Sequence, residues 1–182
     1  MFWFDLSTLN YLLSLGGIAV TIVTVVLFVD YFFNRSTLYV RFVKAFAWPV
    51  IIATTVGGVV IALVYSEYYG FVPCSLCWLQ RIALFPLALF AIMALKMNDT
   101  KQFPLYGIGL SLFGLAVSVY HYIYQMIPED TSSGSVMPCL ADGTGDCAVK
   151  VINEFGFVTF PFLSAVLFAF LIALFLHLRR QK

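Results

Sequence analysis

Four cysteines, arranged as two pairs, are the most reactive side chains of this sequence. Cys74 and Cys77 are separated by two residues in the stretch PCSLCWLQR, and Cys139 and Cys147 lie in one later polar segment. A Cys-x-x-Cys pair could be half of a zinc site, a structural disulfide or a redox pair. A bridge across two residues closes a very short loop and stabilises a fold little, so a redox role is favoured for the first pair.

The second pair leaves two interpretations open. Cys139 and Cys147 could form a permanent disulfide across a small loop, or they could exchange disulfides with Cys74 and Cys77. A zinc site built from all four is disfavoured, because the second pair has seven intervening residues and zinc-binding cysteines are usually separated by about two to four. We therefore predict two disulfides that exchange and no bound metal.

Three further polar residues lie in the apolar segments around the first pair. Cys74, Cys77 and Arg81 have the spacing of one helix face, and an arginine in an apolar helix needs a polar ligand unless it reaches the membrane surface. His121 and Gln125 lie one helical turn apart on the next segment, at a depth similar to that of Arg81. These residues predict a site for a membrane-soluble carrier with polar carbonyls; a histidine hydrogen-bonded to a neighbouring helix is the alternative.

The elements that position these residues are long apolar helices. Of the 182 residues, 62% are hydrophobic and 10% are charged, which excludes a soluble domain of this length. The net charge of +1, with no basic patch, gives no indication of nucleic-acid binding. The segments long enough to cross a membrane lie near residues 9–33, 45–65, 76–97, 105–127 and 157–178. The composition therefore predicts an all-α integral membrane protein.

Basic residues predict the orientation of these helices. They concentrate in alternate connections and at the C-terminus: Arg35, Arg41, Lys44, Lys96, Lys101, Arg179, Arg180 and Lys182. The positive-inside rule then places the C-terminus in the cytoplasm and the N-terminus and all four cysteines outside, where disulfides persist. The first segment has no basic residues before it and no small-residue cleavage site after it, so we expect a retained helix and not a cleaved signal.

The segment after Cys147 has a weaker helical pattern. Val149, Ile152 and Phe155 fall at helical spacing in DCAVKVINEFGF. This spacing predicts a short helix on the membrane surface that limits the movement of Cys147, with ordinary loop packing as the alternative.

The order of these motifs resembles the DsbB/BdbC family of bacterial disulfide-bond formation proteins. The similar stretches are CSLCWLQR at a helix start, YHYIYQ on the next helix, a long outer loop with two cysteines that ends GDCA, and FGFVTFPF opening the last helix. The resemblance implies a four-helix transmembrane bundle over residues 45–182, with the outer loop at 128–156. Residues 1–44 would add a transmembrane helix and a cytoplasmic connection that the usual core lacks.

The resemblance also implies an activity. It indicates a quinone-dependent protein disulfide oxidoreductase of the bacterial cytoplasmic membrane, which reoxidises a DsbA-like thioredoxin-fold partner and passes two electrons to ubiquinone or menaquinone. Cys74 and Cys77 would be the pair next to the quinone, with Cys77 as the thiolate that reacts with it. Arg81 matches the quinone-site arginine of the family, and His121 and Gln125 are predicted to join it.

The same resemblance assigns the loop pair. Cys139 and Cys147 would meet the partner, with Cys139 as the point of attack, although they lie closer together than in the best-known members of the family. A vitamin K epoxide reductase-like enzyme is disfavoured because its loop cysteines precede its C-x-x-C. A non-enzymatic membrane scaffold, stapled by disulfides or binding a metal, is the alternative from another class.

Overall fold

The computed structural model describes residues 5–33, 37–126 and 147–180, and within 37–45 only the backbone. The elements are α1 (Leu6–Phe33), α2 (Thr37–Leu63), a π-helical turn η1 (Val64–Tyr68), α3 (Ser75–Lys96), α4 (Phe103–Met126) and α5 (Phe160–Arg179). Five of the helices in these ranges are long and apolar enough to cross a membrane. The prediction of an all-α, multi-span membrane protein is confirmed.

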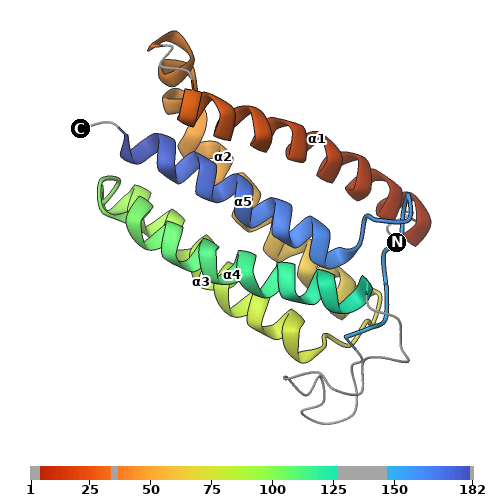
Figure 1. The fold of residues 1–182 in the computed structure, drawn as a ribbon. Coiled ribbons are helices and arrows are strands. Elements are labelled where there is room, and N and C mark those ends of the chain that lie inside the picture. Colours follow the sequence, from red (N-terminus) through yellow and green to blue (C-terminus); the bar gives the residue numbers. More distant parts are fainter. Residues whose placement is uncertain (1–4, 34–36, 127–146, 181–182) are drawn as a thin grey trace.

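The helices lie side by side along a common direction (Figure 1). Helix α5 packs against α4, α1 and α2, and α3 packs against α4 and α2. The approach of α4 to α5 depends on two glycines. A Cβ atom on Gly114 would lie 2.4 Å from Phe168 Cζ, and one on Gly107 would lie 2.7 Å from Phe175 Cε2. Both phenylalanine rings are fully buried against the bare backbone of α4.

Successive helices run in opposite directions, which brings the functional residues to one end of the bundle. The N-terminal ends of α1, α3 and α5 and the C-terminal end of α4 lie at this end, and the C-terminus of the chain lies at the other (Figure 1). Cys74 immediately precedes α3, while His121 and Gln125 lie in the last turns of α4. The alternation of helices therefore supplies both sides of the site.

Helix α2 begins earlier than the sequence pattern suggested. We expected residues 34–44 to connect two helices, but α2 starts at Thr37. The stretch TLYVRFVK contains no glycine or proline, so nothing in it ends a helix, and the helical backbone continues beyond the apolar segment.

The expected short helix after Cys147 is wrong. Val158 and Glu154 exchange backbone hydrogen bonds of 3.0 and 3.1 Å, which close a tight reversal of the chain. Phe155 and Gly156 at its tip have φ values of 55° and 77°, conformations that no right-handed helix contains. Ile152 is buried, whereas Val149 and Phe155 are exposed. Ordinary loop packing, the alternative, describes this segment.

Candidate redox site

The first cysteine of the pair caps α3. Cys74 has the extended conformation of an N-cap residue, and its Sγ accepts a hydrogen bond from the backbone N–H of Cys77 at 3.4 Å. This contact satisfies one of the N–H groups that every helix start leaves unpaired. The prediction that the third helix begins at the cysteine pair is confirmed.

The two sulfurs of the pair are free and close together. Cys74 Sγ lies 2.9 Å from Cys77 Sγ, and neither cysteine forms a disulfide. A disulfide bond measures about 2.05 Å, so a small shift of the side chains would close one. Cys74 is buried and Cys77 is half-buried. The pair is therefore arranged as a reduced dithiol that is ready to be oxidised.

Cys74 is the more acidic partner of this dithiol. Its pKa is lowered from 9.0 to about 4, chiefly by the hydrogen bond with the Cys77 thiol and further by His121, against the opposing effect of burial. Either sulfur can donate while both are protonated. Once one proton is lost, the Cys77 S–H donates to the Cys74 thiolate, which the helix N-terminus also stabilises.

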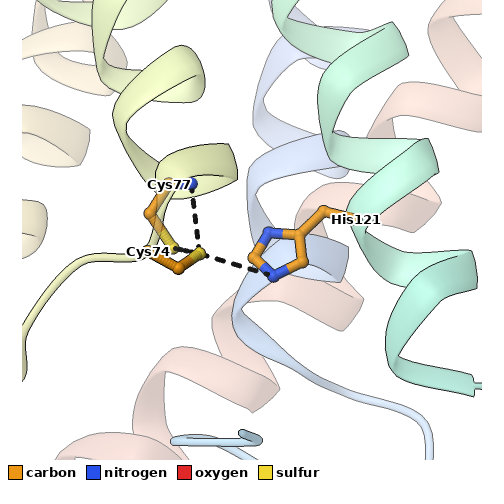
Figure 2. Close-up of side chains that lie close together, drawn as sticks. All are labelled: Cys74, Cys77 and His121. Atoms are coloured by element: carbon orange, nitrogen blue, oxygen red, sulfur yellow. Dashed lines mark hydrogen bonds between the residues drawn. The ribbon is translucent and has the colours of Figure 1, made fainter. Parts of the chain in front are cut away.

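His121 extends from α4 toward the pair (Figure 2). Gln80 Nε2 lies 3.3 Å from His121 Nδ1, and because an amide nitrogen only donates, Nδ1 is the acceptor. In neutral His121 the proton is therefore on Nε2. This Nε2–H lies 3.1 Å from the carbonyl oxygen of Cys147 and 3.9 Å from Cys74 Sγ. The imidazole is thus hydrogen-bonded to helix α3 through Nδ1, while its Nε2–H is directed toward Cys147 and the sulfur of Cys74.

Gln80 is a site residue that the sequence analysis missed. It is buried in α3 and orients the histidine through the contact described above. The sequence could have indicated Gln80, because it is an amide side chain next to Arg81 inside an apolar segment. Polar groups at that depth are costly unless they are hydrogen-bonded.

The second pair contributes Cys147 to the same end of the bundle. Gln125 Nε2 donates to the carbonyl oxygens of Cys147 and Val149, both at 3.1 Å. Cys147 is buried, is disulfide-bonded, and belongs to one buried cluster with Cys74 and Leu76. Ser75 Oγ lies 3.9 Å from its sulfur. Gln125 therefore holds the chain so that one loop cysteine sits beside the first pair. Cys139 lies outside the described residues.

A cavity of about 440 Å³ opens beside the pair. The predicted residues Cys77, Arg81, His121 and Gln125 all line it, whereas Cys74 does not. Most of the remaining lining is apolar and comes from α1, α2 and α5. Arg81 Nη2 donates to the carbonyl oxygen of Ala62 at 2.8 Å, and its guanidinium lies 5.2 Å from the ring centre of Trp78. The structure thus brings four of the predicted site residues to one apolar cavity.

One group of side chains could hold a metal ion. The ligand atoms of Cys74, Cys77 and His121 all lie within 4.8 Å of one another. Two thiolates and one imidazole are a usual partial ligand set for zinc. Within the described residues this site overlaps the dithiol itself, so metal binding and disulfide formation would exclude each other.

Known sequences are similar to this chain over most of its length. The family model described as disulfide bond formation protein DsbB matches residues 44–178. A probable disulfide formation protein of Oceanobacillus iheyensis is 41% identical over 64% of this chain and 76% of its own length. Disulfide bond formation protein C of Bacillus subtilis is 32% identical over 75% of this chain and 91% of its own length. The SPbeta prophage-derived disulfide bond formation protein B of the same species is 36% identical over 76% of this chain and 88% of its own length. No solved structure matches the chain significantly.

Proposed function

The chain belongs to the DsbB family of disulfide bond formation proteins and is a membrane disulfide oxidoreductase, and we propose that it oxidises a thioredoxin-fold, DsbA-like partner at the expense of a membrane quinone. The observation that carries this proposal is the arrangement of three cysteines at one end of the bundle, of which Cys77 lines the cavity. The sulfur of Cys74 lies 2.9 Å from that of Cys77, and the disulfide-bonded Cys147 belongs to the same buried cluster as Cys74. Such an order suits electron flow from a loop disulfide to a carrier in the membrane.

The first half of the proposed reaction takes electrons from the partner. A partner thiolate attacks Cys139 in a Cys139–Cys147 disulfide, which forms a mixed disulfide and releases Cys147 as a thiolate. Cys147 then attacks Cys74 in an oxidised Cys74–Cys77 pair, so that a Cys74–Cys147 bond forms and Cys77 leaves as a thiolate. The position of Cys147 in the same buried cluster as Cys74, with its sulfur 3.9 Å from Ser75 Oγ, supports this step.

The second half restores the loop pair. The other thiol of the partner attacks the mixed disulfide, which releases an oxidised partner and a Cys139 thiolate. Cys139 attacks Cys147, the loop disulfide re-forms, and Cys74 leaves as a thiolate. The low pKa of Cys74, about 4, makes this sulfur a good leaving group. The result is a reduced Cys74/Cys77 pair beside a disulfide-bonded Cys147, which is the combination the structure shows.

The lining of the cavity fits a quinone. Its walls are largely apolar, as an isoprenoid tail requires, and Arg81 carries N–H donors suited to a carbonyl oxygen. The buried Oε1 of Gln125 has no hydrogen-bond partner among the described residues, so an acceptor is available for the hydroxyl group of a hydroquinone. Bound there, a quinone would accept the two electrons and two protons of the dithiol. Arg81, His121 and Gln125 would hold it.

The residues of the chain have separate tasks in this proposal. Cys77 is the sulfur that faces the acceptor, while the Nε2–H of His121 lies within reach of Cys74 Sγ and stabilises its negative charge. The positive charge of Arg81 favours a thiolate at Cys77 when Cys74 is engaged in another disulfide. Apolar walls exclude water, which strengthens these electrostatic effects.

We place the cysteine end of the bundle outside the cytoplasm of a bacterial cell. The support is the distribution of basic residues, since Lys96, Lys101 and Arg179 are at the opposite end of the described helices. This orientation would put the C-terminus in the cytoplasm and the N-terminus outside. Residues 45–182 would then form the catalytic bundle, and residues 1–44 the additional helix and its connection.

The test is a coupled assay with purified protein in detergent. A reduced DsbA-like partner and a quinone should be consumed together, and Cys77→Ala should abolish the consumption of quinone. Leu89→Ala, a change at an exposed position of the same helix, is the matched control and should keep wild-type turnover. Undiminished quinone consumption by Cys77→Ala would refute the mechanism.

A metal-binding scaffold is the second candidate, because Cys74, Cys77 and His121 have their ligand atoms within 4.8 Å. Zinc bound in a 1:1 ratio to purified protein, together with no quinone consumption by the metal-free form, would favour that role. Zinc that binds only to the reduced protein and inhibits its turnover would agree with the oxidoreductase.

A further inference from the structure

Helix α1 forms one wall of the cavity, although it lies outside the part of the chain that the family model matches. That match begins at residue 44, whereas α1 ends at Phe33. Five residues of α1 nevertheless line the cavity: Leu12, Leu13, Gly16, Gly17 and Val20. They cover more than two turns of the helix, and none carries a charge. Without α1, this side of the cavity would open directly to lipid.

Polar contacts fix α1 at the end near the cysteines. The buried Asn10 accepts a hydrogen bond from the hydroxyl group of Tyr65, and its Nδ2 lies 3.5 Å from the carbonyl oxygen of Val151. Tyr65 and Val151 both line the cavity. A buried asparagine in an apolar helix is costly unless its amide is paired, so this contact specifies where α1 sits.

A second set of contacts fixes the opposite end of α1. The buried Asp30 lies 3.4 Å from Nε2 of the buried His177 on α5, and Arg180 Nη1 donates to the carbonyl oxygen of Tyr31 at 2.7 Å. An aspartate within a membrane helix is strongly disfavoured without a partner. With its two ends attached to different parts of the bundle, α1 is an integral wall and not a loosely associated anchor.

The middle of α1 comes close to α5 and leaves space beside it. A Cβ atom on Gly17 would lie 2.2 Å from Leu163 Cδ2, so α1 and α5 touch at this level. A Cβ atom on the adjacent Gly16 would have no atom within 4 Å, although Gly16 also lines the cavity. Gly17 therefore permits the contact between the helices, and a side chain at the exposed Gly16 would enter open space at the cavity lining.

We propose that α1 is part of the acceptor site, and that Leu13, Gly16 and Val20 contact the isoprenoid tail of the quinone. This inference rests on the proposed function, because it assumes that the cavity holds a quinone. The tail is assigned to α1 because its lining residues are apolar, while the groups that could bind a polar ring, Arg81, His121 and Gln125, come from α3 and α4. Gly16 then limits the width available to the tail.

The test compares substitutions at two glycines where an added Cβ atom would meet no other atom within 4 Å. Gly16→Leu projects from the cavity wall, whereas Gly109→Leu lies on α4 outside the cavity and also has no atom within 4 Å of its Cβ. Gly16→Leu should raise the KM for a quinone with a long isoprenoid tail about tenfold, the effect of losing roughly two methylene contacts. It should leave the KM for the protein partner and for a tailless quinone unchanged, and Gly109→Leu should match the wild type.

A binding measurement removes the dependence on turnover. An azido group on the tail of a quinone should, after illumination, label the α1 peptide between Leu12 and Val20. Leu13→Ala should reduce this labelling, and it serves as the test variant if Gly16→Leu does not fold. Label confined to α2 and α5, or equal KM values for both leucine variants, would overturn the role of α1 while the wild type still reduced quinone. A wild type that neither reduced nor bound quinone would overturn the proposed function and this inference together.

Discussion

The acidity of Cys74 gives a prediction that isolates one hydrogen bond. In the reduced pair the Cys77 thiol is the largest cause of the lowered pKa of Cys74, which falls from 9.0 to about 4. At pH 7 a thiol with a pKa of 9.0 is only about 1% ionised, whereas Cys74 would be almost entirely thiolate. Replacing Cys77 by alanine removes the S–H donor but keeps the backbone N–H of that residue, which lies 3.4 Å from the sulfur.

The size of the effect follows from the interaction that is lost. A hydrogen bond to a charged group contributes about 1.5–3 kcal/mol, and about 1.4 kcal/mol corresponds to one pKa unit. Cys77→Ala should therefore raise the pKa of Cys74 by about 1 to 2, while Cys77→Ser, which retains a donor, should raise it much less. His121, 3.9 Å away, continues to hold the value below 9.0 in both variants.

The assay is the rate of alkylation of Cys74 by iodoacetamide as a function of pH, with the loop disulfide left intact. Because only the thiolate reacts, the rate should begin to fall at a higher pH in Cys77→Ala than in Cys77→Ser. The same midpoint for both variants would show that the thiol donor has no such role. A midpoint near 9.0 for the serine variant would refute the assignment of the thiolate to Cys74.

Three other substitutions test the surroundings of the pair. Arg81→Met should raise the KM for quinone by about tenfold or more, because Arg81 lines the cavity proposed to bind the quinone. The KM for the protein partner should stay unchanged, since the partner reacts at the loop cysteines. Gln80→Leu removes the donor to Nδ1 of His121 and with it the contact that orients the imidazole toward Cys74, so quinone reduction should slow, and Gln80→Asn should restore the rate only in part. Gly114→Ala should destabilise the protein by about 1–3 kcal/mol in thermal unfolding, because its Cβ would lie 2.4 Å from Phe168, whereas Gly109→Ala should have little effect.

The candidate site could largely be predicted from helical geometry. The periodicity of a helix puts Arg81 on the same face as Cys77, and the rise per residue puts His121 and Gln125 at the matching end of the next helix. The level of each side chain in the membrane follows from its position along its own helix. Predicting that level does not require the rotation of one helix against another, so the spacing of residues was enough.

Contacts that depend on such rotations could not be predicted. The pairing of Gln80 with His121, of Asn10 with Tyr65 and of Asp30 with His177 joins residues far apart in the sequence. Each requires two particular faces of two helices to meet, and the sequence pattern alone does not select them. For the same reason the first helix was left without a role, although it lines the cavity.

The prediction of a helix after Cys147 was wrong for a local reason. A helical spacing of three apolar residues was outweighed by Gly156, whose φ of 77° allows the chain to reverse. Short apolar patterns of this length do not distinguish a helix from a turn that buries one side chain, here Ile152.

The most direct test of the central claim is to map the disulfides before and after one turnover without quinone. Oxidised protein is mixed with an equal amount of reduced DsbA-like partner, quenched with acid, alkylated and analysed by peptide mass spectrometry. We predict that Cys74 and Cys77 become alkylated while the disulfide of Cys147 is recovered intact, and that adding quinone then re-forms the Cys74–Cys77 bond. A partner that is oxidised while Cys74 and Cys77 remain joined would contradict electron flow through this pair.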